Sequence, residues 1–172
     1  RGDYFELKPE AAHKIKNLVY PVPDPKFPFL GVHFTRMVDG SIECGPNAVF
    51  TFKREGYNRT SFSLVDTFEA LTFKGTWKLF GKHWRKGIDE YKRAFSKHLF
   101  VKELQKMMPS ITVNDVQTAR SGVRAQAIDF DGNMVDDFKI INHNNNIHVL
   151  NAPSPAATAC LSIADEIIST IN

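Results

Sequence analysis

The spacing of apolar residues changes twice along this chain of 172 residues, and these changes set the order of its strands and helices. The first fifty residues alternate between apolar and polar positions over short stretches, which predicts strands divided by turns. Asp39-Gly40 is typical of a hairpin turn, and Gly45-Pro46-Asn47 is expected to break the returning strand. The expected elements are strands over residues 4–7, 19–22, 29–35, 41–44 and 48–52, a helical turn within 9–18, and a proline-rich loop over 23–28.

The middle of the chain has helical spacing. Between residues 63 and 108 no proline occurs, and apolar residues recur every three or four positions. This pattern predicts three or four helices, with breaks near Gly75, Gly81 and Gly87.

Strand spacing returns after residue 120. Strands are expected over 123–130 and 134–141 around an Asp131-Gly132-Asn133 hairpin turn, followed by a buried strand over 147–151. A helix is expected over 156–171, with Ser154 as its N-cap and Pro155 at its first position. The order predicts an α+β fold: a mixed, largely antiparallel sheet with a helical insertion.

Bulk composition indicates one globular domain or one lobe of a larger protein, since 42% of the residues are hydrophobic and 24% are charged. Cys44 and Cys160 lie far apart in sequence, and we expect free thiols in a cytosolic protein. No apolar run is long enough to cross a bilayer. The chain starts without Met in the middle of a strand pattern, so we expect a fragment.

Positive charge is concentrated in the helical block. Ten cations and three anions fall within residues 74–106, which gives this segment +7 against +3 for the whole chain. Aromatic residues interleave with the cations. A solvated helix face, an anionic membrane surface and a nucleic-acid partner all remain open.

The motifs of several common enzyme classes are missing from the sequence. It contains no glycine-rich phosphate loop, no Cys/His spacing typical of a metal site and no nucleophile elbow. The remaining candidates are basic residues in strands or beside glycines. Arg124 could hold a carboxylate through two hydrogen bonds, or it could pair with Asp136 or Asp137. His33 could act as a base, while strand alternation places Arg36 on the opposite face unless a bulge intervenes.

The passage from the strand over 147–151 into the last helix is a second candidate site. A helix N-terminus offers unpaired N–H groups and a positive dipole end, which suits the anionic or electron-rich part of a cofactor. An ordinary helix that closes a core would have the same pattern.

Several segments, taken in order, resemble one family. They resemble the C-terminal part of the L-2-hydroxyglutarate oxidase/dehydrogenase family, within the FAD-dependent D-amino-acid-oxidase-like superfamily. The resemblance is weakest from about residue 61 to 110. Its motifs are Tyr20-Pro21-Val22-Pro23, Gly31-Val32-His33-Phe34-Thr35-Arg36, Asp39-Gly40-Ser41, Gly45-Pro46-Asn47-Ala48, Ser121-Gly122-Val123-Arg124-Ala125-Gln126 and Leu150-Asn151-Ala152-Pro153-Ser154-Pro155-Ala156-Ala157-Thr158.

The resemblance implies a two-domain flavoprotein of which this chain holds one part. Residues 1–120 would form the substrate-binding domain, with a helical insertion over about 63–108. Residues 121–172 would complete its sheet and return by a strand and a helix toward an FAD domain that is missing here. Because the glycine-rich loop belongs to that missing domain, this chain alone is not expected to bind FAD or to be active.

The resemblance also implies roles for particular residues. Arg124 would bind the substrate's α-carboxylate, Arg36 a second carboxylate and His33 would be the base, while no metal is expected. The flavin-facing residues would be Asn151, Ala152, Pro153, Ser154, Pro155, Ala156, Ala157 and Thr158. The implied reaction oxidises an L-2-hydroxy dicarboxylate to the 2-oxo acid by hydride transfer to FAD.

Other functions stay open. These are an FAD-dependent amino-acid oxidase of the same superfamily, and a non-enzymatic module that binds anionic membrane through residues 74–106. The expected partners are a small dicarboxylate and a membrane surface, without nucleic acid. The expected location is the cytoplasm, peripheral to the inner membrane.

Overall fold

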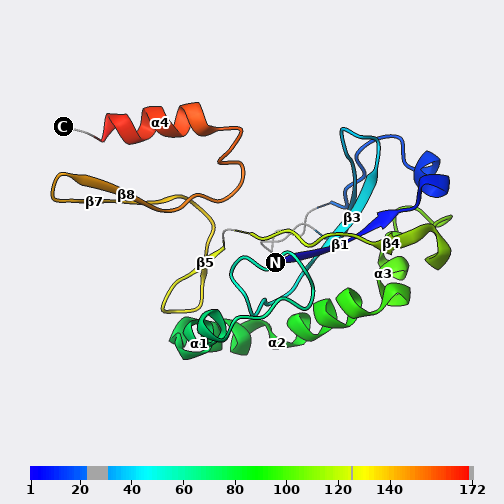
Figure 1. Ribbon diagram of the computed structural model, residues 1–172, viewed down its shortest axis with the longest axis horizontal. Coiled ribbons are helices and arrows are strands. Elements are labelled where there is room, and N and C mark those ends of the chain that lie inside the picture. The colour runs from blue at the N-terminus through cyan, green and yellow to red at the C-terminus, as the bar shows by residue number, and fades with distance from the viewer. Residues whose placement is uncertain (23–30, 125, 171–172) are drawn as a thin grey trace. The chain divides into compact units, whose positions relative to one another are not determined.

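The computed structural model describes residues 1–22, 31–124 and 126–170, apart from the side chain of residue 86 (Figure 1). It confirms the α+β fold, with helices and antiparallel sheets. The chain forms two compact units: unit 1 comprises Arg1–Ala70 and Lys82–Val123, and unit 2 comprises Leu71–Gly81 and Arg124–Asn172. The expected loop over 23–28, the start of the strand over 29–35, residue 125 and residues 171–172 lie outside the described residues.

Unit 1 is built on a four-stranded antiparallel sheet with the order β2-β3-β1-β4. Its strands are β1 (Gly2–Leu7), β2 (His33–Arg36), β3 (Ile42–Ala48) and β4 (Val116–Thr118). The predicted hairpin turn joins β2 to β3. Asp39 Oδ1 accepts hydrogen bonds from the backbone N–H and the hydroxyl of Ser41, and Gly40 has φ +88°.

The core of unit 1 lies on one face of this sheet. Phe5, Cys44 and Phe34 are neighbours across three strands and are almost fully buried. Two short 3₁₀ helices, η1 (Pro9–Lys14) and η2 (Val113–Asp115), border the core. Helix α3 (Lys97–Leu104) closes it, and the Phe100 ring lies 4.5 Å from the Phe5 ring (Figure 1). Because successive residues of a strand face opposite sides, Glu6, His33 and Glu43 lie on the other face.

Two expectations for the first strands were wrong. Gly45-Pro46-Asn47 does not end β3, which continues to Ala48 through a register irregularity opposite β1. Residues 19–22 form no strand, and of residues 48–52 only Ala48 belongs to one, as the last residue of β3. Isolated bridges join Val19 to Phe34 and Phe52 to Phe62. Pairing with β1 keeps β3 extended beyond the proline, whereas the other two segments lack a continuous partner in the described sheet.

The helical insertion contains α1 (Leu64–Thr72), α2 (Lys74–Phe95) and α3, as expected. The break expected near Gly75 falls two residues earlier, at Phe73, but the breaks predicted near Gly81 and Gly87 were wrong, because α2 runs without interruption through both glycines. A glycine inside a helix costs only about 1 kcal/mol, which the surrounding turns offset. The breaks fall at Phe73 and at Ser96, whose hydroxyl caps α3 by accepting from the Leu99 N–H.

In unit 2, a short hairpin packs against the first turns of α2. Strands β5 (Ala127–Ile128) and β6 (Met134–Val135) flank the predicted turn, where Asp129 Oδ1 accepts from the N–H groups of Asp131 and Asn133. The Lys78 ammonium bonds Asp131 at 2.7 Å. Gly132 lies against the helix backbone: a Cβ added there would stand 2.6 Å from the nitrogen of Leu79.

The strand expected over 134–141 is in fact divided between two hairpins. Strand β7 (Lys139–His143) pairs with β8 (Asn146–Asn151), not with β5. Asp137 Oδ1 accepts from the Phe138 N–H at 2.7 Å, and the chain turns there before β7 begins. The expectation of a buried strand over 147–151 was also wrong, since β8 is exposed or half-exposed except at Asn151.

The last helix begins later than predicted. Helix α4 covers Cys160–Ser169, and its N-cap position is occupied by Ala159, not Ser154. The Ala156 N–H donates to the Pro153 carbonyl, and the N–H groups of Thr158 and Ala159 donate to the Pro155 carbonyl. These bonds form consecutive turns, so Pro155 does not occupy the first position of the helix.

Candidate functional site

His33 begins the edge strand β2 and lies on the sheet face opposite the core. Its ring stacks on Tyr20 with centroids 4.5 Å apart, and its Nδ1 lies 2.9 Å from the Gly31 carbonyl oxygen. A carbonyl oxygen can only accept, so Nδ1 carries the proton in this bond. In the neutral ring Nε2 is then the unprotonated nitrogen, which is the state that a general base requires.

The same sheet face carries two carboxylates that the sequence reasoning did not select. Glu43 lies directly opposite Glu6 on β1 and opposite Thr35 on β2. Burial raises the pKa of Glu43, and the negative charges of Glu6 and Asp39 raise it further. Alternation along each strand could have placed these residues on one face, but only the register places the two carboxylates opposite each other.

Arg36 is exposed at the end of β2, on the other side of the strand from His33. The β2–β3 register is regular from His33 to Arg36, so the bulge that would turn Arg36 toward His33 does not occur. Its Nη1 donates to the Ile15 carbonyl at 3.3 Å. Arg36 therefore lies on the core side of the sheet edge.

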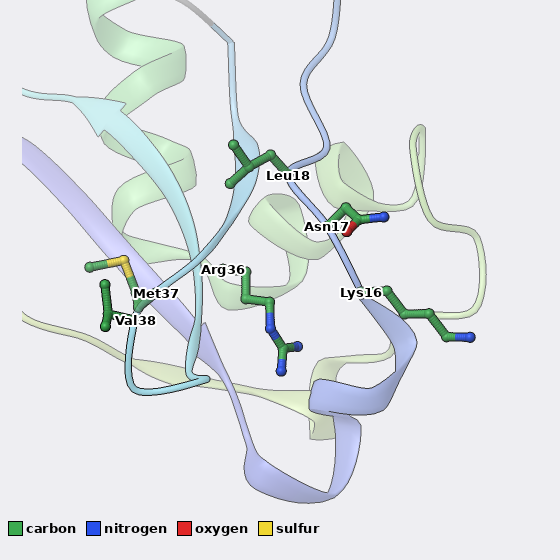
Figure 2. A pocket seen from close by; sticks show the side chains of 6 residues that line it. All are labelled: Lys16, Asn17, Leu18, Arg36, Met37 and Val38. Carbon is green, nitrogen blue, oxygen red and sulfur yellow. The ribbon is translucent and has the colours of Figure 1, made fainter.

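An open pocket of about 560 Å³ surrounds Arg36 (Figure 2). The Arg36 side chain extends between the hairpin and the segment that follows η1, whereas the Lys16 side chain points away from it. The pocket thus presents one guanidinium with apolar and amide neighbours. Its lining residues are Lys16, Asn17, Leu18, Arg36, Met37 and Val38.

Arg124 follows a segment that is tied to β1. Gly2 and Gly122 exchange two backbone hydrogen bonds of 2.8 Å, and the Ser121 hydroxyl donates to buried Asp3 at 2.6 Å. Arg124 is exposed and precedes β5, so it does not begin the strand as expected. Unit 1 ends at Val123 and Arg124 opens a segment of unit 2.

The segment from Asn151 to Thr158 is a turn that is mostly exposed. Its buried residue is Asn151, whose Nδ2 donates to the Asp137 carbonyl at 3.5 Å. The Ala156 and Thr158 N–H groups already donate within the turns, so these two donors are engaged inside the segment.

The candidate residues are divided between the units. His33 and Arg36 belong to unit 1, and Arg124 and the Asn151–Thr158 turn belong to unit 2. Within the described ranges, no group of three or more His, Cys, Asp or Glu residues has the arrangement of a metal site. Cys44 is buried and Cys160 exposed, both as free thiols. Among the helices described, none is both long and apolar enough to cross a membrane.

Comparison with known proteins confirms the resemblance that the motifs indicated. A protein of Indibacter alkaliphilus named L-2-hydroxyglutarate dehydrogenase is 51% identical to this chain over 163 residues. The chain is similar to L-2-hydroxyglutarate dehydrogenases. The Nematostella vectensis protein with that name, described as mitochondrial, is 53% identical over 169 residues, and the Escherichia coli K12 protein is 46% identical over 171.

Similarity covers nearly all of this chain but less than half of each relative. The matches with the Indibacter and Nematostella proteins cover 95% of the chain, and the match with the E. coli protein covers 99%. The same matches cover 41% of the Indibacter protein, 37% of the Nematostella protein and 40% of the E. coli protein. The chain therefore spans about two fifths of the length of these relatives. No protein-family model matches the chain.

Proposed function

We propose that this chain is the substrate-binding part of an FAD-dependent enzyme that oxidises L-2-hydroxyglutarate to 2-oxoglutarate. The observation that carries the proposal is the identity of about one half, along 95% of the chain, to proteins named L-2-hydroxyglutarate dehydrogenase. The activity is assigned to the longer protein and not to these 172 residues alone, because the chain spans about two fifths of the relatives.

His33 is the proposed base. With Nδ1 donating to Gly31, its Nε2 can accept the proton of the substrate's hydroxyl group. Stacking on Tyr20 restricts rotation of the ring, which keeps Nε2 in one direction. Loss of the hydroxyl proton favours departure of the hydride from the α-carbon.

The arginines are the proposed carboxylate anchors. Arg124 has the fork of donors that matches a carboxylate, and it lies exposed before β5. Arg36 lines a pocket but lies on the face away from His33. Arg36 could bind the substrate's second carboxylate only if that carboxylate reached around the end of β2. We therefore propose Arg124 as the primary anchor.

The Asn151–Thr158 turn would contact the flavin, and the glycine-rich phosphate site would belong to the remaining three fifths of the protein. The chemistry that bound FAD supplies is acceptance of the hydride from the α-carbon. Two N–H groups of the turn donate hydrogen bonds within it and are not offered to the flavin. The turn would therefore contribute its shape and exclude water from the flavin.

The experiment is turnover by the full-length protein with FAD. We expect L-2-hydroxyglutarate to reduce an artificial electron acceptor with equal formation of 2-oxoglutarate. Faster reduction by L-glutamate, with release of ammonia, would favour the amino-acid oxidase alternative. Absence of turnover with both substrates in a flavin-loaded protein would refute the proposal.

A second candidate function is contact with an anionic membrane, and the surface of α2 favours it. The second half of this helix exposes apolar residues on one stripe: Trp84 is 55% exposed, Ile88 46% and Phe95 65%. Arg85 and Lys92 lie beside this stripe, with Asp89 among them. Trp77, also exposed, precedes Trp84 by seven residues, which is two helical turns.

The composition of this stripe fits lipid better than protein. Protein interfaces are depleted in Lys, whereas helices that lie in a membrane surface combine Trp and apolar residues with flanking cations. The proposed location is therefore a membrane surface.

Sedimentation of the full-length protein with vesicles tests this surface. We expect binding to phosphatidylcholine vesicles that contain phosphatidylglycerol, weaker binding at high salt, and a loss of about fivefold for each cation reversed in Arg85→Glu and Lys92→Glu. Lys53→Glu, an exposed change outside α2, is the matched control. An equal loss of vesicle binding in the Lys53→Glu control would overturn the membrane assignment. Binding of the protein to a DNA duplex without binding to vesicles would also overturn it.

A further inference from the structure

We infer that Tyr20 is a substrate-binding residue of the site that contains His33, and that its phenol hydroxyl donates a hydrogen bond to the second carboxylate of the substrate. The inference rests on the proposed function, because it takes His33 to face the substrate. It supplies a donor next to His33, on the face of β2 where Arg36 does not lie.

Backbone pairing places Tyr20 directly across from His33. Val19 and Phe34 exchange two backbone hydrogen bonds, of 3.1 and 2.9 Å, in an antiparallel bridge. In antiparallel pairing the neighbouring positions, here Tyr20 and His33, face each other without exchanging hydrogen bonds, and their side chains lie close together. The two rings accordingly stack, with centroids 4.5 Å apart and an angle of 28° between their planes.

The Tyr20 side chain is accessible to a ligand. Tyr20 is 44% exposed, and over residues 1–22, 31–124 and 126–170 its hydroxyl has no hydrogen-bond partner. A phenol hydroxyl is uncharged at neutral pH, so it can donate to a carboxylate without the cost of burying a cation. Because the hydroxyl oxygen is bonded directly to the stacked ring, it lies within the length of one small substrate molecule from the His33 imidazole.

On the other side of His33, toward β3, a substrate would meet two obstacles. His33 faces Gly45 there, and a Cβ added to Gly45 would stand 2.7 Å from Cδ1 of Tyr4, so the Tyr4 ring already covers this backbone. Two residues along β3, Glu43 would repel a substrate carboxylate, since like charges that face each other are unfavourable. Tyr20 lies across β2 from both residues, so a dicarboxylate bound at Nε2 would extend toward Tyr20.

This arrangement supplies the second anchor that a dicarboxylate needs. Arg124 is proposed for the α-carboxylate, whereas Arg36 donates to the Ile15 carbonyl on the face away from His33. A hydrogen bond from Tyr20 would hold the second carboxylate while Nε2 of His33 meets the hydroxyl group. Tyr20 would then favour a dicarboxylate over a 2-hydroxy acid whose chain ends in a methyl group, because the methyl group leaves the phenol without an acceptor.

The test is Tyr20→Phe in the full-length protein with FAD, which keeps the stacked ring and removes only the hydroxyl. We expect KM for L-2-hydroxyglutarate to rise about 10- to 100-fold, as for the loss of a hydrogen bond to a charged group, with a smaller change in kcat. KM for L-2-hydroxyvalerate, which has the same carbon chain without the second carboxylate, should not change. The dissociation constants of 2-oxoglutarate and 2-oxovalerate, measured by calorimetry, should follow the same pattern.

Tyr57→Phe is the matched control. Tyr57 is 41% exposed, its ring lies 4.7 Å from the Arg120 guanidinium, and its hydroxyl likewise has no hydrogen-bond partner in the part of the chain that the structure describes. We expect this variant to keep the wild-type KM for both hydroxy acids. An equal rise in KM for L-2-hydroxyglutarate in Tyr57→Phe would overturn the assignment to Tyr20.

The outcomes separate the two proposals. Wild-type turnover with unchanged KM and 2-oxoglutarate binding in Tyr20→Phe would overturn the role of Tyr20 and leave the proposed function intact. An equal rise in KM for L-2-hydroxyvalerate would show that Tyr20 only positions His33, and would also overturn its role. If the wild type binds 2-oxoglutarate without turnover, and Tyr20→Phe weakens that binding, the role of Tyr20 holds and the proposed reaction fails. If the wild type binds neither L-2-hydroxyglutarate nor 2-oxoglutarate, both proposals fail.

Discussion

The Nδ1 atom of His33 lies 2.9 Å from the carbonyl oxygen of Gly31, two residues earlier in the chain. This short-range bond fixes which ring nitrogen carries the proton. It also gives His33 two separable roles: Nδ1 orients the ring, and Nε2 is left to act as a base.

Replacing His33 by Asn tests the second role. The Asn side-chain amide can still donate to Gly31, but it has no basic nitrogen. We expect kcat to fall by about 10²- to 10⁴-fold, the usual contribution of a general base, with unchanged thermal unfolding. Steady-state kinetics with L-2-hydroxyglutarate measures the change. A variant with wild-type kcat would exclude His33 as the base.

Arg124→Lys tests the carboxylate anchor while keeping the positive charge. Lysine cannot form the two parallel hydrogen bonds, so kcat/KM for L-2-hydroxyglutarate should fall by about tenfold or more. The loss should appear mainly in KM. Arg120→Lys is the matched control, because Arg120 stacks over the Tyr57 ring at 4.7 Å. Equal kinetics of the two variants would remove Arg124 as the anchor.

Gly132→Ala should destabilise unit 2. Gly132 has φ +74°, and its Cβ would stand 2.6 Å from the Leu79 nitrogen, so the β5–β6 turn would have to move off α2. The expected loss in the free energy of unfolding is about 1–3 kcal/mol. Gly81→Ala, in the same unit, is the control: its Cβ would meet no atom within 4 Å, and the helix should gain about 0.5–1 kcal/mol. Urea unfolding of both variants measures the difference, and equal effects would contradict the close packing.

Glu43→Gln should stabilise the protein at neutral pH. The pKa of Glu43 is higher in the folded state than in the unfolded state. The protonated Glu43 side chain therefore contributes its full stability below the unfolded-state pKa, and this contribution is lost as the pH rises through the folded-state pKa. Glutamine does not titrate and escapes both the burial of the charge and the facing charge of Glu6, so the variant should gain roughly 0.2–1 kcal/mol at pH 7 and nothing in acid.

A double-mutant cycle with Glu6→Gln identifies the source of this gain. If the facing carboxylates cause the destabilisation, the second substitution adds little to the first. The exposed Glu55→Gln is the control. Full additivity of Glu43→Gln and Glu6→Gln would show that the two carboxylates do not interact.

Short-range patterns in the sequence predicted much of the fold. The Asp-Gly turn at residues 39–40 and the Asp-Gly-Asn turn at 131–133 both connect strands as expected, because turn geometry depends on a few adjacent residues. Helical spacing placed the insertion and a break near Gly75, but the sequence also predicted breaks at Gly81 and Gly87, where α2 continues. A glycine in sequence looks like a break whether or not the helix around it continues.

The site was less predictable, since it depends on which distant segments meet. Alternation indicated that His33 and Arg36 lie on opposite faces, and the regular register confirms it. The helix N-terminus expected after Ser154 was wrong, because turn hydrogen bonds compete with the first helical turn. The position of the Tyr4 ring over Gly45 needed the pairing of β1 with β3.

The sequence by itself determined the order of strands and helices, the two hairpin turns and the similarity to L-2-hydroxyglutarate dehydrogenases, because these depend on neighbouring residues or on residue identity. Only the tertiary structure decided that β3 continues past Pro46 and that Glu43 faces Glu6. It also decided that the ring of Tyr4 lies over Gly45 opposite His33. Register and packing join residues about forty positions apart, and their energy is gained only when the sheet forms.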